Sequence, residues 1–195
     1  RLTMRRLAQI GAVALSVGLG AGPARADERV SICYNYGCLA QAEVVFSEAR
    51  LADVAERLSR ADSAVAERAI LAQVLGQLYR WVGEQSPIGA DRPGNYLDFG
   101  VNGMMDCIDH SESTTRLLRL LEARGLLHFH VVEPIARRVR WVFAQHFSAV
   151  IRERCEAPPA VGARFAVDTW FGEHGDPAVV LPLEDWLDGE GPNVS

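Results

Sequence analysis

Three side chains in the second half of the chain carry the groups that covalent amide chemistry requires. Cys107 supplies a thiol, His146 an imidazole and Asp168 a carboxylate, in that order along the sequence. A thiol becomes a strong nucleophile when an imidazole takes its proton, and a carboxylate can hold that imidazole in the required tautomer. The three residue types therefore predict a nucleophilic triad in which Cys107 attacks a carbonyl carbon.

The element that would carry the thiol is a helix. Asp106 is a residue type that caps helix N-termini, and apolar residues then recur at helical spacing as far as Arg124, before Gly125. Unpaired N–H groups and the helix dipole favour an anion at such an N-terminus. We therefore expect the pKa of Cys107 to be lowered and its thiolate to be stabilised.

The elements that would carry the other two residues are strands. Short β-branched or aromatic runs separated by turn residues predict strands at 127–132, 139–143, 146–151, 164–170 and 178–181. Neighbouring antiparallel strands can place His146 and Asp168 on one sheet face, with the helix presenting Cys107 against it.

Two further helices are expected upstream, over 42–58 and from Asp62 to about residue 82, followed by a long loop over 83–103. Helices followed by strands predict an α+β fold, with N-terminal helices and a central helix carrying the nucleophile, packed on an antiparallel β-sheet. The 195 residues, 49% of them apolar, fit one domain over 27–195, with a helical part at about 40–83 and a core at about 100–186.

The first 26 residues have the composition of a secretory signal peptide. Arginines precede an apolar run over 7–19, and Ala24-Arg25-Ala26 forms a small-x-small cleavage site. The run is too short for a membrane span, so no stable span is expected after cleavage. We expect an exported protein, periplasmic or extracellular. The net charge of −5 argues against docking on nucleic acid.

Export changes the interpretation of the four cysteines, because disulfides persist outside the cytoplasm. Cys33 and Cys38 are separated by four residues and are candidates for a short disulfide, with Cys38–Cys155 as the rival pairing. A Cys107–Cys155 disulfide would instead abolish the proposed nucleophile.

The other histidines suggest two alternatives to this triad, a metal site and a different base for Cys107. His128 and His130 alternate on one predicted strand, and with His146 and Asp109 they could bind a metal; otherwise no metal or cofactor is expected. His110 follows Cys107 by one helical turn, but a base on the same helix is poorly placed to serve an incoming carbonyl.

These motifs together resemble the transglutaminase-like branch of the papain-fold cysteine peptidases. The resemblance covers about residues 100–183 and rests on Asp106-Cys107-Ile108-Asp109-His110-Ser111, Leu117-Leu118, Gly125-Leu126, His146 and Asp168-Thr169-Trp170. It implies a papain-like core, with Cys107 as nucleophile, His146 as general base and acid, and Asp168 as the orienting acid. It also implies that the Cys107 N–H and an upstream side chain bind the oxyanion, with Asn102, Gln85 and Trp81 as candidates.

The sequence therefore predicts an exported thiol-dependent amide hydrolase or acyltransferase. Its substrates would be peptides, proteins or cell-wall amides. The alternative is a catalytically inactive papain-fold binding or scaffold module, which the unidentified oxyanion donor favours; a histidine-rich metal-binding protein is the third class.

Overall fold

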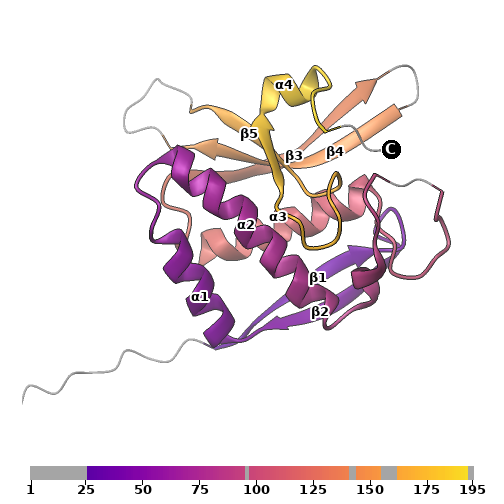
Figure 1. The fold of residues 1–195 in the computed structure, drawn as a ribbon, viewed down its shortest axis with the longest axis horizontal. Coiled ribbons are helices and arrows are strands. Elements are labelled where there is room, and N and C mark those ends of the chain that lie inside the picture. The colour runs from indigo at the N-terminus through magenta and orange to yellow at the C-terminus, as the bar shows by residue number, and fades with distance from the viewer. Residues whose placement is uncertain (1–25, 95–96, 141–143, 155–161, 193–195) are drawn as a thin grey trace, which may run out of the picture.

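The computed structural model describes residues 26–94, 97–140, 144–154 and 162–192. Its elements are β1 (Glu28–Tyr34), β2 (Ala40–Phe46), α1 (Glu48–Leu58), α2 (Ala64–Gly83), the 3-10 helix η1 (Pro87–Ala90), α3 (Cys107–Ala123), β3 (His130–Arg140), β4 (Ala144–Glu153), β5 (Arg164–Asp168), β6 (Val179–Pro182) and α4 (Leu183–Leu187). The predicted α+β class is confirmed (Figure 1). The expected signal peptide lies, apart from its last residue, outside the described residues.

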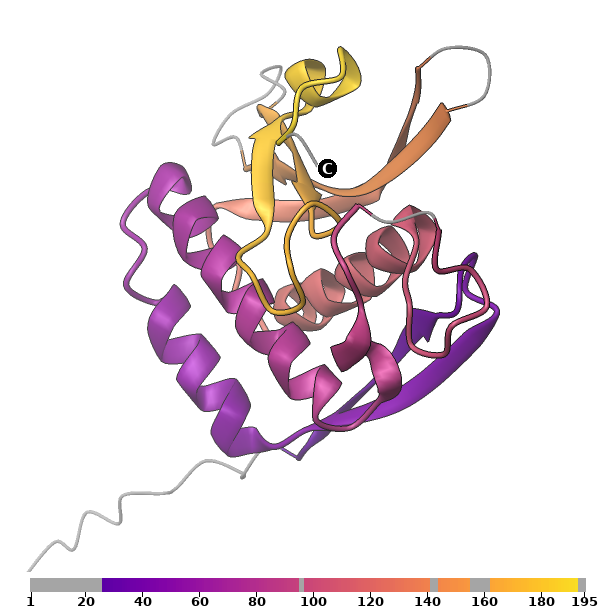
Figure 2. The same ribbon diagram turned by 45° about the vertical axis from the view of Figure 1, so that its right-hand side comes forward.

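Helix α3 lies between the β1–β2 hairpin and the four-stranded sheet, with α1 and α2 along one side (Figure 2). It begins at Cys107 because the Asp106 carboxylate accepts the backbone N–H groups of Ile108 and Asp109. Gly125 follows its C-terminus at φ +71°, a left-handed conformation that glycine adopts without strain. The helix that the sequence predicted therefore has nearly the predicted bounds.

The large sheet has the order β3-β4-β5-β6, and every neighbouring pair is antiparallel. Both of its faces are covered, which explains why residues 148–151 of β4 are all buried. Ala149 and Ile151 pack into the main core, while Val150 packs on the opposite face against Leu183 and Trp186 of α4. Successive strand residues point to opposite faces, so each helix meets its own set of side chains.

The prediction of one helix over 42–58 is wrong. Residues 40–46 form β2, which pairs with β1, and α1 starts only after Ser47, whose side chain caps it. Val44 and Phe46 are fully buried while Val45 between them is not, which is the period of a strand. The runs predicted as strands at 127–132 and 139–143 also differ: β3 spans His130–Arg140 as one strand, and 141–143 lie outside the described residues.

The loop predicted over 83–103 contains η1, and a second long connection, between β5 and β6, crosses α2. Ala178 N–H donates to Ala72 O at 3.1 Å, one turn before Gly76. A Cβ on Gly76 would lie 2.7 Å from the carbonyl oxygens of Gly175 and Asp176, so only glycine allows this close crossing. No helix in the described part of the chain is both long and apolar enough to cross a bilayer.

Candidate active site

His146 and Asp168 form a buried pair on the face of the sheet that α4 covers. Because Ala149 pairs with Val167, Asp168 lies on the same face as Ser148 and His146. His146 Nε2 and Asp168 Oδ2 are 2.6 Å apart, and the two residues are 6% and 2% exposed. The structure thus brings these two predicted residues into direct contact. The expectation that the helix bearing the thiol packs on the same sheet face is wrong, because α3 packs with Ala149 and Val167 on the opposite face.

The Asp168 carboxylate has two further donors. Trp186 Nε1–H donates to Oδ2 at 2.9 Å, and the Trp170 backbone N–H donates to Oδ1 at 3.1 Å. A carboxylate held by several donors keeps one orientation, so it can fix the imidazole that it contacts. Trp186 lies on α4, a five-residue helix whose role the sequence analysis missed.

Aromatic side chains surround the His146 ring. The centroids of the Trp170, Phe171 and Trp186 rings lie 4.8, 5.4 and 5.5 Å from its centroid. The second ring nitrogen, Nδ1, is buried and has no hydrogen-bond partner among the described residues. When Nε2–H donates to Asp168, Nδ1 carries the lone pair, so the ring has the tautomer of a base.

Cys107 is a free, buried thiol at the first position of α3. Its Sγ lies 4.0 Å from Gln145 O and accepts the Phe147 backbone N–H, so it contacts the β4 backbone on both sides of His146. It also packs with Trp170 and Phe171, two of the rings that surround the imidazole. Within the described residues no hydrogen bond joins the sulfur to the His146 ring.

The expectation that the helix N-terminus lowers the pKa of Cys107 is wrong. Burial raises the pKa of this thiol to about 11. The Phe147 N–H opposes the rise, whereas the negative charges of Asp106 and Asp168 add to it. The capping carboxylate that starts the helix thus offsets the dipole that was expected to stabilise the thiolate.

The turn between Cys33 and Cys38, which a disulfide closes, hydrogen-bonds to the first turn of α3. Cys33 is joined to Cys38, the pairing that the short gap favoured. The N–H groups of Tyr36 and Cys38 donate to the Asp109 carboxylate at 2.7 Å each, and that of Gly37 donates to Asp106 Oδ2 at 3.0 Å. Residues 35–38 all have positive φ, which turns successive N–H groups toward the two carboxylates.

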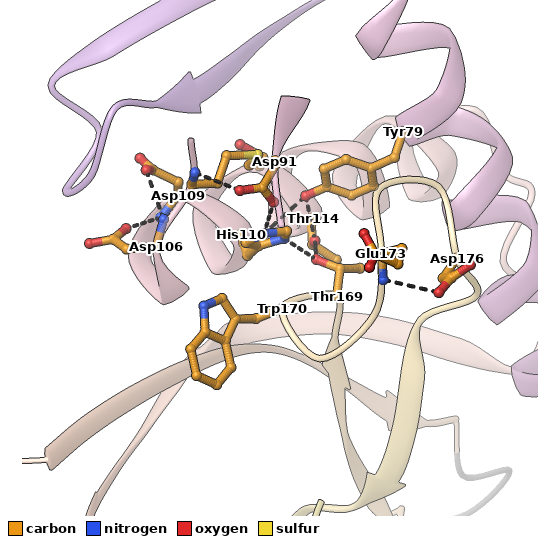
Figure 3. A network of polar contacts seen from close by, with 12 residues as sticks. Tyr79, Asp91, Asp106, Asp109, His110, Thr114, Thr169, Trp170, Glu173 and Asp176 are labelled. Atoms are coloured by element: carbon orange, nitrogen blue, oxygen red, sulfur yellow. Dashed lines mark hydrogen bonds and ion pairs between the residues drawn. The ribbon is translucent and has the colours of Figure 1, made fainter. Parts of the chain in front are cut away.

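His110 belongs to a second network, in which its ring contacts Asp91 and Thr169 (Figure 3). Its Nε2 lies 2.8 Å from Asp91 Oδ2 and its Nδ1 lies 2.9 Å from Thr169 Oγ1. Thr114 links Thr169 to Tyr79, and burial raises the pKa of Tyr79 to about 12. The network holds Thr169, which in sequence lies between Asp168 and Trp170, and both of these neighbours contact His146. Sequence reasoning missed Asp91, because nothing in the loop pattern distinguishes it from a solvated aspartate.

The alternative metal site is not formed. His128 is exposed and precedes β3, whereas His130 is buried, so the two side chains do not share a site. Both ring nitrogens of His130 are occupied: Nδ1 lies 2.8 Å from Glu67 Oε1, and Nε2 lies 3.2 Å from Arg68. The metal-ligand types that do cluster among the described residues are Cys33, Cys38 and Asp109, and the disulfide uses both sulfurs.

The three oxyanion candidates lie in different places. Asn102 is exposed, and its Oδ1 accepts from Asn35 Nδ2 at 3.2 Å. The Gln85 side chain accepts a hydrogen bond from the Val45 N–H and donates one to the Val45 carbonyl. The Trp81 ring centroid lies 5.0 Å from Arg50 Cζ. Their observed contacts are with the hairpin and α1, so the role of Asn102 stays a prediction.

A cavity of about 120 Å³ adjoins the His–Asp pair. Its lining is formed by Arg138, Arg140, Ala144, Gln145, His146 and Trp170. Two larger hollows, of about 380 and 440 Å³, lie elsewhere, along α1 and α2 and between β1 and α3. The small cavity reaches the imidazole of His146.

Comparison of the chain with protein-family models, with curated proteins and with solved structures finds no match in any of the three. The function must accordingly be argued from the site itself.

Proposed function

We propose that this chain is an exported thiol-dependent amide hydrolase or acyltransferase with a papain-like core. One observation carries the proposal: Asp168 holds His146 by Nε2, while the buried Nδ1 has no hydrogen-bond partner among the described residues, on the strand that Cys107 Sγ contacts. A helix bearing a thiol at its first residue, packed on an antiparallel sheet bearing the His and Asp, is the arrangement that a papain-like core uses. The Cys33–Cys38 disulfide supports export.

The chemistry follows from these positions. The Cys107 S–H proton passes to His146 Nδ1 as the sulfur attacks the carbonyl carbon, and Asp168 stabilises the imidazolium formed. Collapse of the tetrahedral intermediate breaks the C–N bond, and His146 returns the proton to the leaving amine. Water, or an amine in acyl transfer, then attacks the thioester; His146 takes its proton and gives it back to the Cys107 sulfur.

The proton transfer is what overcomes the raised pKa of the thiol. A buried thiol does not ionise alone near neutral pH, but transfer to a neighbouring imidazole keeps the net charge of the site constant. Hydrogen bonds of catalytic groups are often long before substrate binds and tighten in the complex. The proposal therefore requires that the His146 ring reach the sulfur when a substrate occupies the site.

The test uses p-nitrophenyl acetate as a generic acyl donor, on protein carrying Cys155→Ala so that Cys107 is the one thiol outside the disulfide. We expect a burst of one p-nitrophenolate per chain and an acetyl group on Cys107 by mass spectrometry, both abolished by Cys107→Ala. Asp168→Asn should slow acylation about 100-fold, since it loses the orienting carboxylate.

Asp91→Asn is the matched control, because it makes the same change in the other buried His–Asp pair, that of His110. It should leave the acylation rate within about threefold. Equal loss in both variants would assign the effect to folding rather than to the triad and would contradict the proposal.

A second candidate function is a papain-fold binding module without turnover. The observation that favours it is the buried Cys107 thiol with its pKa raised to about 11 and no hydrogen bond to His146 within the described residues. It predicts a folded protein that forms no acyl-Cys107 with p-nitrophenyl acetate, so the same experiment separates the two functions.

A further inference from the structure

The cavity beside His146 carries positive charge on an acidic protein. Arg138 lies directly opposite His146 in the β3–β4 ladder, and Arg140 lies two residues further on the same face. Both arginines line the cavity together with the imidazole. Residues 134–147 contain no Asp or Glu, although the whole chain has a net charge of −5.

The two guanidinium groups are held in place by the C-terminal segment. Arg138 Nη1 donates to Trp186 O at 2.6 Å and to Glu190 O at 2.8 Å, and the guanidinium lies 4.6 Å over the Trp186 ring. Arg140 Nη1 donates to Gly189 O at 3.2 Å. Gly189 has φ +100°, a conformation that glycine adopts without strain, and a Cβ there would lie 2.5 Å from Arg140 Cζ.

The hydrogen bond of Arg140 is to a backbone carbonyl, which orients the guanidinium without neutralising it. Arg140 forms no ion pair with any described residue, whereas many other arginines of the chain pair with a carboxylate. A guanidinium fixed at a concave surface, with no ion pair to a described residue, is suited to a carboxylate, which it can bind through paired N–H groups.

We propose that this cavity is a carboxylate-binding subsite, so that the preferred acyl donors are amides with an acidic group close to the scissile carbonyl. The inference rests on the proposed thiol chemistry and adds the substrate class to it. The cavity has a volume of about 120 Å³, which is about the volume that four water molecules occupy in liquid water. That space accommodates a carboxylate and its adjoining carbon. A carboxylate there places the rest of the donor beside His146 and Trp170, next to Cys107.

Binding is tested apart from chemistry, in protein carrying Cys107→Ala. The probes are N-acetyl-L-glutamate and its neutral analogue N-acetyl-L-glutamine, followed by the NMR shift of the His146 Cε1–H. We expect saturable shifts with glutamate at an affinity about tenfold higher than with glutamine, reduced to the glutamine level by Arg140→Gln. Arg140 is exposed, so this variant should fold.

Arg137→Gln is the matched control. Arg137 precedes Arg138 on the same strand but pairs with Phe147 and points to the other face, where it donates to Gln145 Oε1 at 3.4 Å. It removes the same charge from the same strand, so it should keep the preference for glutamate. The proposed subsite would be contradicted if both variants lost the preference for glutamate over glutamine. It would also be contradicted if the parent protein showed no such preference.

A kinetic arm tests the substrate class with Cys107 in place. The mono-p-nitrophenyl ester of glutaric acid carries a carboxylate, and p-nitrophenyl pentanoate is its neutral counterpart of equal chain length. Acylation should favour the glutarate ester about tenfold; Arg140→Gln should remove that preference, whereas the control Arg137→Gln should keep it. Acylation by both esters at equal rates would contradict the proposed subsite but not the proposed thiol chemistry. Glutamate binding without any acylation supports the subsite and contradicts the proposed thiol chemistry.

Discussion

Trp186 donates its indole N–H to Asp168 Oδ2 at 2.9 Å, and the same oxygen lies 2.6 Å from His146 Nε2. Helix α4 therefore completes the His–Asp pair from the side of the sheet opposite α3. Trp186 is fully buried, and its ring also faces the imidazole and supports Arg138. One side chain thus links the orienting carboxylate, the imidazole and the basic cavity.

Trp186→Phe should lower the free energy of unfolding by about 2 kcal/mol, because it leaves a small void and removes one donor from a buried carboxylate. Acylation of Cys107 should slow as well, since Asp168 is then held less firmly. Urea unfolding and p-nitrophenyl acetate kinetics measure the two effects. Trp81→Phe, on the half-buried face of α2, should stay within about 0.5 kcal/mol of the parent. A stable Trp186→Phe protein with full activity contradicts the role given to the indole N–H.

The thiol of Cys107 should react as a high-pKa group in the free protein. With its pKa raised to about 11, the rate of alkylation by iodoacetamide should keep rising with pH up to about 10 and show no plateau near neutrality. Asp106→Asn should accelerate alkylation at pH 8 severalfold, because the negative charge of Asp106 raises the pKa and an asparagine can still cap the helix. Asp53→Asn, on an exposed part of α1, is the control and should change nothing.

Asp109 should make stability depend on pH in the direction opposite to that of an ordinary paired carboxylate. Burial raises its pKa to about 6, and the charge of Asp106 adds to this, although the N–H donors around the carboxylate oppose it. The folded state then binds a proton more tightly than the unfolded chain, so this group's contribution to stability falls as the pH rises from about 4 to about 6.

Urea unfolding of the parent and of Asp109→Asn at pH 4, 5, 6 and 7 measures this. We expect the difference, parent minus variant, to decrease across that window and then to level off. Comparing the two proteins cancels groups of opposite slope, such as Glu133, whose pKa the Arg152 hydrogen bond lowers. A difference that increases with pH would falsify the assigned shift.

The Cys33–Cys38 disulfide should stabilise the fold by roughly 2 kcal/mol, as expected for closing a short loop. The double variant Cys33→Ser, Cys38→Ser should lose that amount in urea unfolding. It should also slow acylation of Cys107, since the turn donates three N–H groups to the two aspartates that start α3. Dithiothreitol should reproduce both effects in the parent and leave the double variant unchanged.

Local patterns predicted the elements that the proposed triad needs. The bounds of α3 follow from a capping aspartate and a terminal glycine, and the strands bearing His146 and Asp168 follow from β-branched runs. The β1–β2 hairpin was missed because Val45, Ala49, Ala52 and Ala55 recur at helical spacing, while the partner that makes residues 40–46 a strand is β1, which precedes that window in the chain. Whether such a segment forms a strand depends on its pairing partner as well as on its own spacing.

The sequence by itself determined the order of thiol, imidazole and carboxylate, and the position of the thiol at the first turn of a helix. The tertiary structure alone decided which histidine meets which acid, since His146, His110 and His130 each have their own buried carboxylate. It also decided the protonation of Cys107. Local sequence gives the direction of a helix dipole, but the cost of removing a thiolate from water depends on every element packed around it, and here that cost is the larger.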